Sequence, residues 1–153
     1  MAGRSLTLAL WLAVWPASAQ MPASGTLSDT TVLGLKAHGN SLWLLSNSDD
    51  ESALIHYDLA STRVVRRYPV AGAGHVFNDL AIARAGDVYL TDTRAGAVWH
   101  LATGSTDLAK LPERFEFANG IALSPDGRLF YMANIQDDKK TGFNPITILK
   151  LHL

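Results

Sequence analysis

The chain has 153 residues, of which 48% are hydrophobic and 18% are charged, a composition that can bury the core of one domain. Thirteen basic and 14 acidic side chains give a net charge of −1, which argues against binding to nucleic acid or to anionic membranes. The sequence contains no cysteine, and this excludes disulfides, thiolate metal sites and cysteine nucleophiles.

The first 19 residues predict a secretory signal peptide. Arg4 gives a positive start, residues 6–15 form an apolar run, and Ala17 and Ala19 form a small-residue cleavage signal. The run is too short to span a bilayer as a helix. We therefore expect cleavage after Ala19, export to the periplasm or out of the cell, and no membrane association of the mature chain. Residues 20–28 are rich in small residues, Pro and Gly, and predict a short linker.

A β-hairpin pattern occurs twice, with a spacing of 41 residues between the two copies. In residues 78–90 and 119–131, apolar side chains alternate, a turn with glycine follows, and a second apolar stretch begins. A looser copy covers residues 32–45. Alternation with a period of two predicts strands that bury one face.

Third and fourth apolar stretches follow the first two hairpins, at residues 54–59 and 63–68 and again at 97–102 and 108–111. Four short strands in about 40 to 45 residues are typical of a β-propeller blade. We therefore predict an all-β fold, a partial β-propeller of about three four-stranded antiparallel blades. The expected domain covers residues 29–153, with blades at about 29–70, 74–111 and 117–153.

Three blades are fewer than a closed ring contains, because closed propellers typically have about four to eight. An open set of blades exposes edge strands and apolar surface. We therefore expect this sequence to be an incomplete copy of a longer protein. Self-association of two halves through the open blade edges is the alternative.

Several strings of the sequence resemble one protein family, the SMP-30/gluconolactonase/LRE family. They are His-Val-Phe-Asn-Asp-Leu at residues 75–80, Gly-Asp-Val-Tyr-Leu-Thr-Asp-Thr at 86–93, and Phe-Ala-Asn-Gly-Ile-Ala-Leu-Ser-Pro-Asp-Gly at 117–127. The resemblance extends over about residues 30 to 134. It implies a six-bladed propeller and, as for many members, a metal-dependent hydrolase of a sugar lactone or a similar small ester.

Two asparagines occupy the same position of the repeat, and the resemblance gives each a role. Asn119 matches the metal-ligand asparagine of the family, and Asn78 matches an asparagine that binds substrate or metal-bound water. The innermost strands of a propeller line one channel, so equivalent residues of successive blades converge there. The implied cofactor is a divalent cation, with Ca²⁺ the first choice because it takes carboxylate, amide and water oxygens. Zn²⁺ and Mg²⁺ are the alternatives.

Two further residues are candidates for substrate binding beside Asn78. Asp79 either faces the channel or caps the strand entry. His75 has an imidazole whose ordinary pKa of about 6.5 suits proton transfer, and its alternative role is that of a loop histidine between blades. No residue is assigned as the catalytic group.

The sequence also departs from the family pattern. The acidic metal ligand of the first blade has no counterpart, and the later aspartate ligand would lie beyond residue 153. Val76 stands where some members carry a substrate-binding arginine. The alternative function is therefore a non-catalytic propeller that binds a small molecule or a protein, or an inactive fragment.

Overall fold

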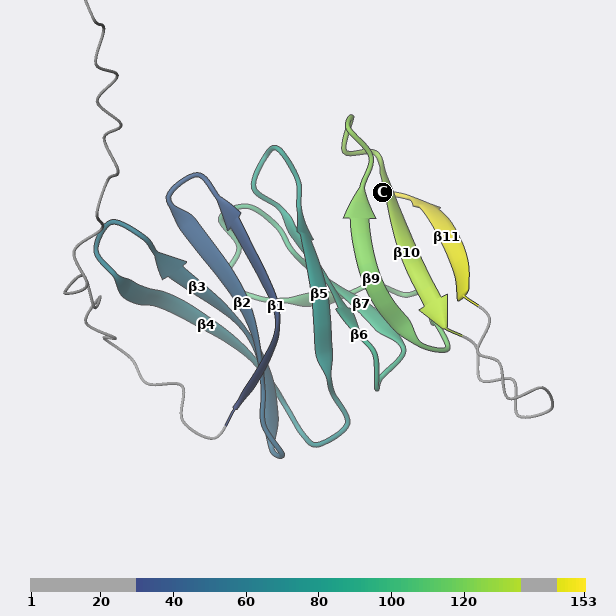
Figure 1. Cartoon of the computed structure of the whole chain (residues 1–153), viewed down its shortest axis with the longest axis horizontal. Helices are drawn as coiled ribbons and strands as arrows, with labels where there is room; N and C mark the ends of the chain where they lie inside the picture. The colour runs from purple at the N-terminus through teal and green to yellow at the C-terminus, as the bar shows by residue number, and fades with distance from the viewer. Residues whose placement is uncertain (1–29, 136–145) are drawn as a thin grey trace, which may run out of the picture.

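A computed structural model describes residues 30–135 and 146–153 of the chain. These residues form eleven β-strands and no helix, arranged as three antiparallel sheets that lie next to one another (Figure 1). The prediction of an all-β fold is confirmed for these residues. The expected signal peptide and the expected linker lie outside the described residues.

Each sheet follows the chain from one edge to the other, and we name the sheets blades 1, 2 and 3. Blade 1 has the strand order β1-β2-β3-β4, blade 2 the order β5-β6-β7-β8, and blade 3 the order β9-β10-β11. Blade 3 therefore has three strands among the described residues, one fewer than predicted. The strand bounds are β1 Thr31–His38, β2 Ser41–Asn47, β3 Glu51–Asp58, β4 Arg63–Ala71, β5 Phe77–Ile82, β6 Val88–Asp92, β7 Ala97–Leu101, β8 Ala109–Lys110, β9 Ala118–Leu123, β10 Leu129–Ile135 and β11 Ile146–His152.

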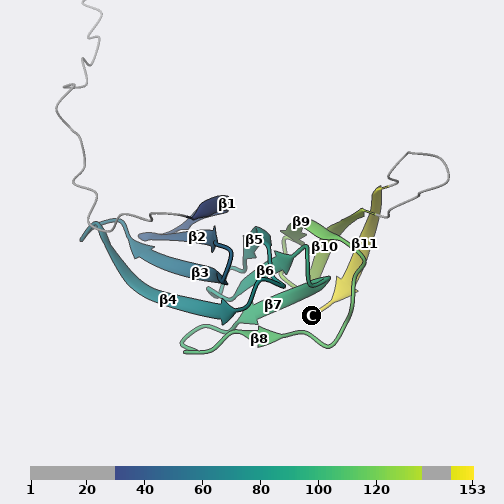
Figure 2. The same cartoon turned by 90° about the horizontal axis from the view of Figure 1, so that it is seen from below.

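The first strands of the three blades lie along one side of the array (Figure 2). Strands β1, β5 and β9 run side by side in Figure 1, and the view from below in Figure 2 shows the later strands spreading away from them. Contacts between their residues agree with the pictures, because a Cβ at Gly34 of β1 would lie 2.9 Å from the carbonyl oxygen of Asn78 in β5. This arrangement is the one expected for neighbouring propeller blades.

The core consists of two apolar layers between the blades. Alternate side chains of a strand point to opposite faces of its sheet, so blade 2 contributes to both layers. Burying each large apolar side chain stabilises the fold by about 1.5 to 3 kcal/mol. Between blades 1 and 2 the buried residues are Trp43, Leu45, Leu54, Tyr68, Phe77, Leu80, Val88, Leu90 and Leu101. Between blades 2 and 3 they are Ala81, Tyr89, Val98, Ala118, Ile121, Phe130 and Met132.

A β-bulge interrupts the pairing near the start of each innermost strand. The register shifts between Val32 and Leu35 in β1 and between Phe77 and Leu80 in β5. In β9 it shifts between Ala118 and Ile121, which pair with Asn134 and Met132 of β10. A bulge places two residues of one strand opposite a single residue of its partner. The bulged pairs are Leu33 and Gly34 in blade 1, Asn78 and Asp79 in blade 2, and Asn119 and Gly120 in blade 3.

Candidate functional site at the entry of the innermost strands

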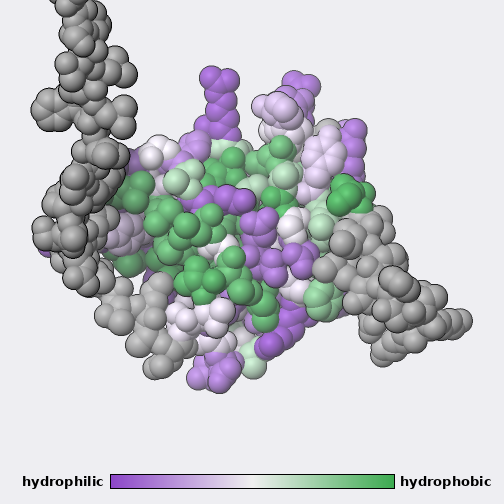
Figure 3. All heavy atoms as spheres, viewed as in Figure 1, coloured by the Kyte–Doolittle hydropathy of each residue, from purple (hydrophilic) through white to green (hydrophobic). Residues whose placement is uncertain are grey.

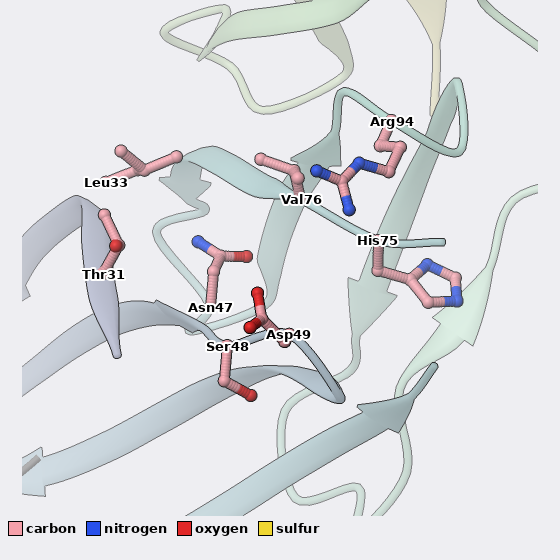
Figure 4. Close-up of a pocket in the computed structure, with 8 residues that line it drawn as sticks. All are labelled: Thr31, Leu33, Asn47, Ser48, Asp49, His75, Val76 and Arg94. Carbon is pink, nitrogen blue, oxygen red and sulfur yellow. The ribbon is translucent and has the colours of Figure 1, made fainter. Parts of the chain in front are cut away.

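The three bulges lie at one end of the blades, where several loops also meet. Antiparallel pairing brings the end of β2 beside the start of β1, and the end of β6 beside the start of β5. A cavity of about 330 Å³ opens at this end between blades 1 and 2 (Figure 4). Its walls are formed by Thr31, Leu33, Asn47, Ser48, Asp49, His75, Val76 and Arg94.

Asn78 and Asn119 occupy equivalent positions on adjacent innermost strands, each as the first residue of its bulge. Both residues are partly exposed. In the part of the chain that the structure describes, neither side-chain amide has a hydrogen-bond partner. A free amide offers one acceptor oxygen and two N–H donors. These two amides are therefore available to a ligand at this end of the innermost strands. The corresponding residue of blade 1 is Leu33, which is exposed and offers no polar group.

The carboxylate of Asp79 connects the three innermost strands. Its Oδ1 accepts a hydrogen bond from the backbone N–H of Leu80 at 2.8 Å, and its Oδ2 accepts one from the backbone N–H of Ile121 at 3.0 Å. The Nζ of Lys36 in β1 lies 3.5 Å from Oδ1. Asp79 thus fastens β9 and β1 to β5, and the bond to Ile121 brings the segment of Asn119 beside the segment of Asn78. Each of its oxygens therefore accepts a backbone hydrogen bond.

Asn47 fixes the start of β5 from the neighbouring blade. Its Nδ2 donates to the carbonyl oxygen of Phe77 at 2.9 Å, and its Oδ1 accepts from the N–H of the same residue at 2.7 Å. The hydroxyl of Ser52 donates to the same Oδ1 at 2.8 Å. Blade 2 holds blade 3 in a comparable way, since the Oγ1 of Thr93 donates to the carbonyl oxygen of Ala118 at 2.5 Å. The bonds to Phe77 and Ala118 position the residues immediately before Asn78 and Asn119.

His75 is held against a buried carboxylate at one side of the cavity. Its Nδ1 lies 2.5 Å from the Oδ2 of Asp92, and its ring packs edge-on against Phe77 and Trp99. Asp92 is fully buried, and its oxygens also accept bonds from Trp99 Nε1 and from the N–H groups of Val76 and Ala95. Because a carboxylate accepts only, Nδ1 of His75 carries the proton. Its Nε2 has no hydrogen-bond partner among the described residues.

The cavity wall carries one charge of each sign. In Figure 4 the carboxylate of Asp49 and the guanidinium of Arg94 extend toward the middle of the opening, while His75 lies on the side opposite Thr31 and Leu33. Arg94 Nη1 also donates to the carbonyl oxygen of Ala73 at 2.5 Å, which fixes its position. A small polar molecule with one apolar side would match these walls.

The donors at this end do not by themselves complete a cation site. Among residues 30–135 and 146–153, no group of three or more His, Asp or Glu side chains is placed to hold a metal ion. Ca²⁺ takes about six to eight oxygen ligands, usually including carboxylates. Asn78 and Asn119 contribute neutral oxygens only, and each oxygen of Asp79 already accepts a hydrogen bond from a backbone N–H. The metal-ligand role that the resemblance implies for Asn119 thus requires carboxylates from elsewhere.

The sequence interpretation named Asn78, Asp79, His75 and Asn119, and the structure places all four at the same end of the blades. It did not identify Asn47 or Asp92 as part of this region. Their partners lie 30 and 17 residues away along the chain. The only available signal was a polar residue at the end of an apolar strand, a pattern that turns also produce.

No described residue belongs to a helix long and apolar enough to cross a membrane.

Solved structures with a similar fold are β-propellers. Virginiamycin B lyase from Staphylococcus aureus matches with a TM-score of 0.58 and 18% identity, covering 83% of this chain and 43% of the lyase chain. Hydrazine synthase from Kuenenia stuttgartiensis matches with a TM-score of 0.62 and 17% identity, covering 84% and 38%. A luciferin-regenerating enzyme matches with a TM-score of 0.52 and 12% identity, covering 80% and 45%. This chain therefore spans less than half the length of these proteins, and at such identities the likeness shows the fold alone.

Comparison with family models gives a more specific result. Among curated proteins, none matches this chain. The model of the SMP-30/gluconolactonase/LRE-like region matches residues 13–143, which is most of the chain and includes all four candidate residues. The chain therefore belongs to the SMP-30/gluconolactonase/LRE-like family.

Proposed function

We propose that these blades form the ligand-binding part of a lactonase-like propeller whose ligand is a sugar lactone or a similar small ester. One observation carries the proposal: Asn78 and Asn119 present free amides from equivalent bulges on adjacent innermost strands, in a chain of the gluconolactonase family. The N-terminal sequence pattern supports export, so the ligand would be met in the periplasm or outside the cell.

The chemistry of the amides fits an uncharged cyclic ester. The Nδ2 groups of Asn78 and Asn119 donate to a lactone carbonyl or ring oxygen, and their Oδ1 atoms accept from sugar hydroxyls. His75 supplies a polar group at the wall of the neighbouring cavity, which Asn78 and Asn119 do not line, since Asp92 orients its ring through Nδ1 and leaves Nε2 for a ligand. Leu33 provides an apolar contact at the third equivalent position.

Hydrolysis requires more than these residues. A divalent cation, for which Ca²⁺ remains our first choice and Zn²⁺ and Mg²⁺ the alternatives, would polarise the ester carbonyl. The described residues do not fit a complete site for it, as shown above. We therefore propose cation-dependent hydrolysis only on the condition that residues outside the described part of the chain supply carboxylate ligands.

Calorimetric titration with gluconolactone, in the presence and absence of CaCl2, tests the binding part of the proposal. Asn78→Ala and Asn119→Ala should each weaken lactone binding by about tenfold, the effect of losing roughly one hydrogen bond in a site. Asn40→Ala is the matched control, because Asn40 lies in an exposed turn and its side chain bonds to Asp58, away from the two asparagines. Equal binding by all three variants, or no binding by the parent chain, would contradict the proposal.

Binding without catalysis is the second candidate, and the state of Asp79 favours it. Its carboxylate accepts the backbone hydrogen bonds of Leu80 and Ile121, so the packing of the strands accounts for its position without a catalytic role. This candidate predicts that the lactone binds but is not hydrolysed in the presence of Ca²⁺, Zn²⁺ or Mg²⁺. A rate of lactone hydrolysis that increases with the concentration of the added cation, and that is lower in Asn119→Ala than in the parent chain, would favour the hydrolase instead.

A further inference from the structure

Two side chains of opposite charge face the cavity between blades 1 and 2 and do not pair with each other. Asp49 lies in the turn between β2 and β3, and Arg94 lies in the turn between β6 and β7. Figure 4 shows the carboxylate of Asp49 across the opening from the guanidinium of Arg94. Among the described residues, that carboxylate has no ion pair and no hydrogen bond. The cavity therefore offers one charge of each sign to a ligand.

The guanidinium of Arg94 is held in place by the backbone of a neighbouring loop. Its Nη1 donates to the carbonyl oxygen of Ala73 at 2.5 Å, and its Nε and Nη2 have no partner among the described residues. The turn is fixed as well, because the N–H of Ala95 donates to the buried carboxylate of Asp92 at 3.1 Å. The Nε and Nη2 of a guanidinium present two parallel N–H groups that match the two oxygens of a carboxylate. Arg94 is thus prepared to bind a carboxylate.

The turn that carries Asp49 is fixed by hydrogen bonds of its neighbours. The hydroxyl and the backbone N–H of Ser48 both donate to the carbonyl oxygen of Glu51, at 3.0 and 2.8 Å. The N–H of Gly72 donates to the carbonyl oxygen of Asp50 at 2.7 Å, which ties this turn to the connection between blades 1 and 2. None of these bonds involves the carboxylate of Asp49, so its oxygens remain acceptors for an ammonium group.

Part of the cavity wall is apolar. Leu33 and Val76 line it, and Leu33 is 50% exposed. Hydrophobic side chains gather over β1 and β5 on the face shown in Figure 3. The cavity volume of about 330 Å³ lies at the lower end of the range for small-molecule sites, about 300 to 1,000 Å³. A ligand that matches all of these walls is therefore small, carries both charges and has an apolar group.

We propose that this cavity binds a small zwitterion, an α-amino acid with a short apolar side chain. Arg94 binds the carboxylate through Nε and Nη2, and Asp49 accepts hydrogen bonds from the ammonium group. Leu33 and Val76 contact the apolar side chain. An anion without the ammonium group would place its charge beside Asp49, and a cation without the carboxylate would leave Arg94 without a counter-charge. The zwitterion satisfies both charged residues.

The proposal does not rest on the one made for the lactone. Asn78 and Asn119 do not line this cavity, and its wall residues lie between positions 31 and 94, in blades 1 and 2 and their connections. Binding of the two ligands is measured separately. A chain that binds gluconolactone but no amino acid contradicts only the present proposal, and the reverse result contradicts only the proposed function.

Isothermal titration calorimetry of the whole chain with L-valine tests this site. Two analogues each lack one charge, since 3-methylbutanoate has no ammonium group and isobutylamine has no carboxylate. Each analogue should bind about tenfold more weakly than valine or worse, because it loses one charged contact. No binding of valine at millimolar concentration, or equal binding of the three compounds, would overturn the proposal.

Substitutions at the two charged residues locate the binding site. Arg94→Gln and Asp49→Asn should each raise the dissociation constant of valine about tenfold. Asp50→Asn and Arg84→Gln are the matched controls, because they remove the same charges from residues that do not line the cavity. Asp50 is the next residue of the same turn, and Arg84 lies in the turn between β5 and β6, at the other end of blade 2. Circular dichroism checks that each variant folds. Equal effects at the wall residues and at the controls would show that net charge, and not this cavity, governs binding, and the proposal would be wrong.

Discussion

The carboxylate of Asp79 accepts a hydrogen bond from the backbone N–H of Ile121, 42 residues further along the chain, at 3.0 Å. The bond joins two innermost strands directly beside the free amides of Asn78 and Asn119. The same carboxylate also caps Leu80 and lies near Lys36 of blade 1. One side chain therefore sets the relative position of three strands at the place where a ligand is expected to bind.

Replacing Asp79 should loosen this junction. Asp79→Ala leaves the N–H groups of Leu80 and Ile121 without their acceptor, and we expect a loss of about 1 to 3 kcal/mol in the free energy of unfolding. Urea denaturation followed by tryptophan fluorescence measures it. Lys36→Met removes the ion pair but leaves the hydrogen bonds of Asp79 in place. It should change the free energy of unfolding by less than about 1 kcal/mol, because the pair is partly exposed. A larger effect of Lys36→Met than of Asp79→Ala would show that charge, and not backbone capping, holds the strands.

Asn47 should contribute more to stability than an asparagine of the surface. Asn47→Ala removes the partners of both the N–H and the carbonyl oxygen of buried Phe77, so we expect a loss of about 2 to 4 kcal/mol. Asn40→Ala, which removes an exposed bond to Asp58, should stay within about 0.5 kcal/mol of the parent chain. Hydrogen exchange of the Phe77 amide gives a local readout, and it should become faster in Asn47→Ala alone. Unchanged exchange at Phe77 would contradict this role.

The strands and the repeat could be predicted from the sequence because both are local properties. Alternating apolar residues and glycine turns predict hairpins, and the copy after 41 residues identified Asn78 and Asn119 as equivalent. The partners of the polar side chains could not be predicted, since they belong to other blades. The sequence shows that Asn47 is polar at a strand end, but only the packing of blade 2 brings Phe77 to it. Likewise, the equivalence of Leu33 to Asn78 and Asn119 becomes visible only from the strand pairing at the bulges.

Burial of His56 predicts a dependence of stability on pH. Burial lowers the pKa of this imidazole, which stacks on Trp43, and the charge of nearby Asp58 opposes the effect. The unfolded chain therefore takes up the proton first as the pH falls. The stability that neutral His56 gives is complete above the ordinary pKa of about 6.5 and is lost as the pH falls below it. Urea unfolding at several pH values should show this loss in the parent chain and less of it in His56→Phe, which keeps the stacked ring.

Ser41→Ala is the control for this pH effect. It removes the hydroxyl that lies 2.8 Å from Nε2 of His56 but retains the imidazole, so the decline at low pH should persist. An identical decline in His56→Phe and in the parent chain would assign the pH dependence to other groups.

Gly34 should be the least tolerant position of β1, because no side chain fits between this strand and blade 2. A Cβ at Gly34 would lie 2.7 Å from Leu45 Cδ1 and 2.9 Å from the carbonyl oxygen of Asn78. The backbone of β5 would have to move, so we expect Gly34→Ala to reduce the free energy of unfolding by about 1 to 3 kcal/mol. It should also weaken gluconolactone binding, since the displaced residue carries one of the two free amides. Gly74→Ala is the matched control, because a Cβ there meets no atom within 4 Å, and it should leave stability and binding unchanged. If Gly34→Ala lost stability but bound the lactone normally, Asn78 would not be part of the ligand site.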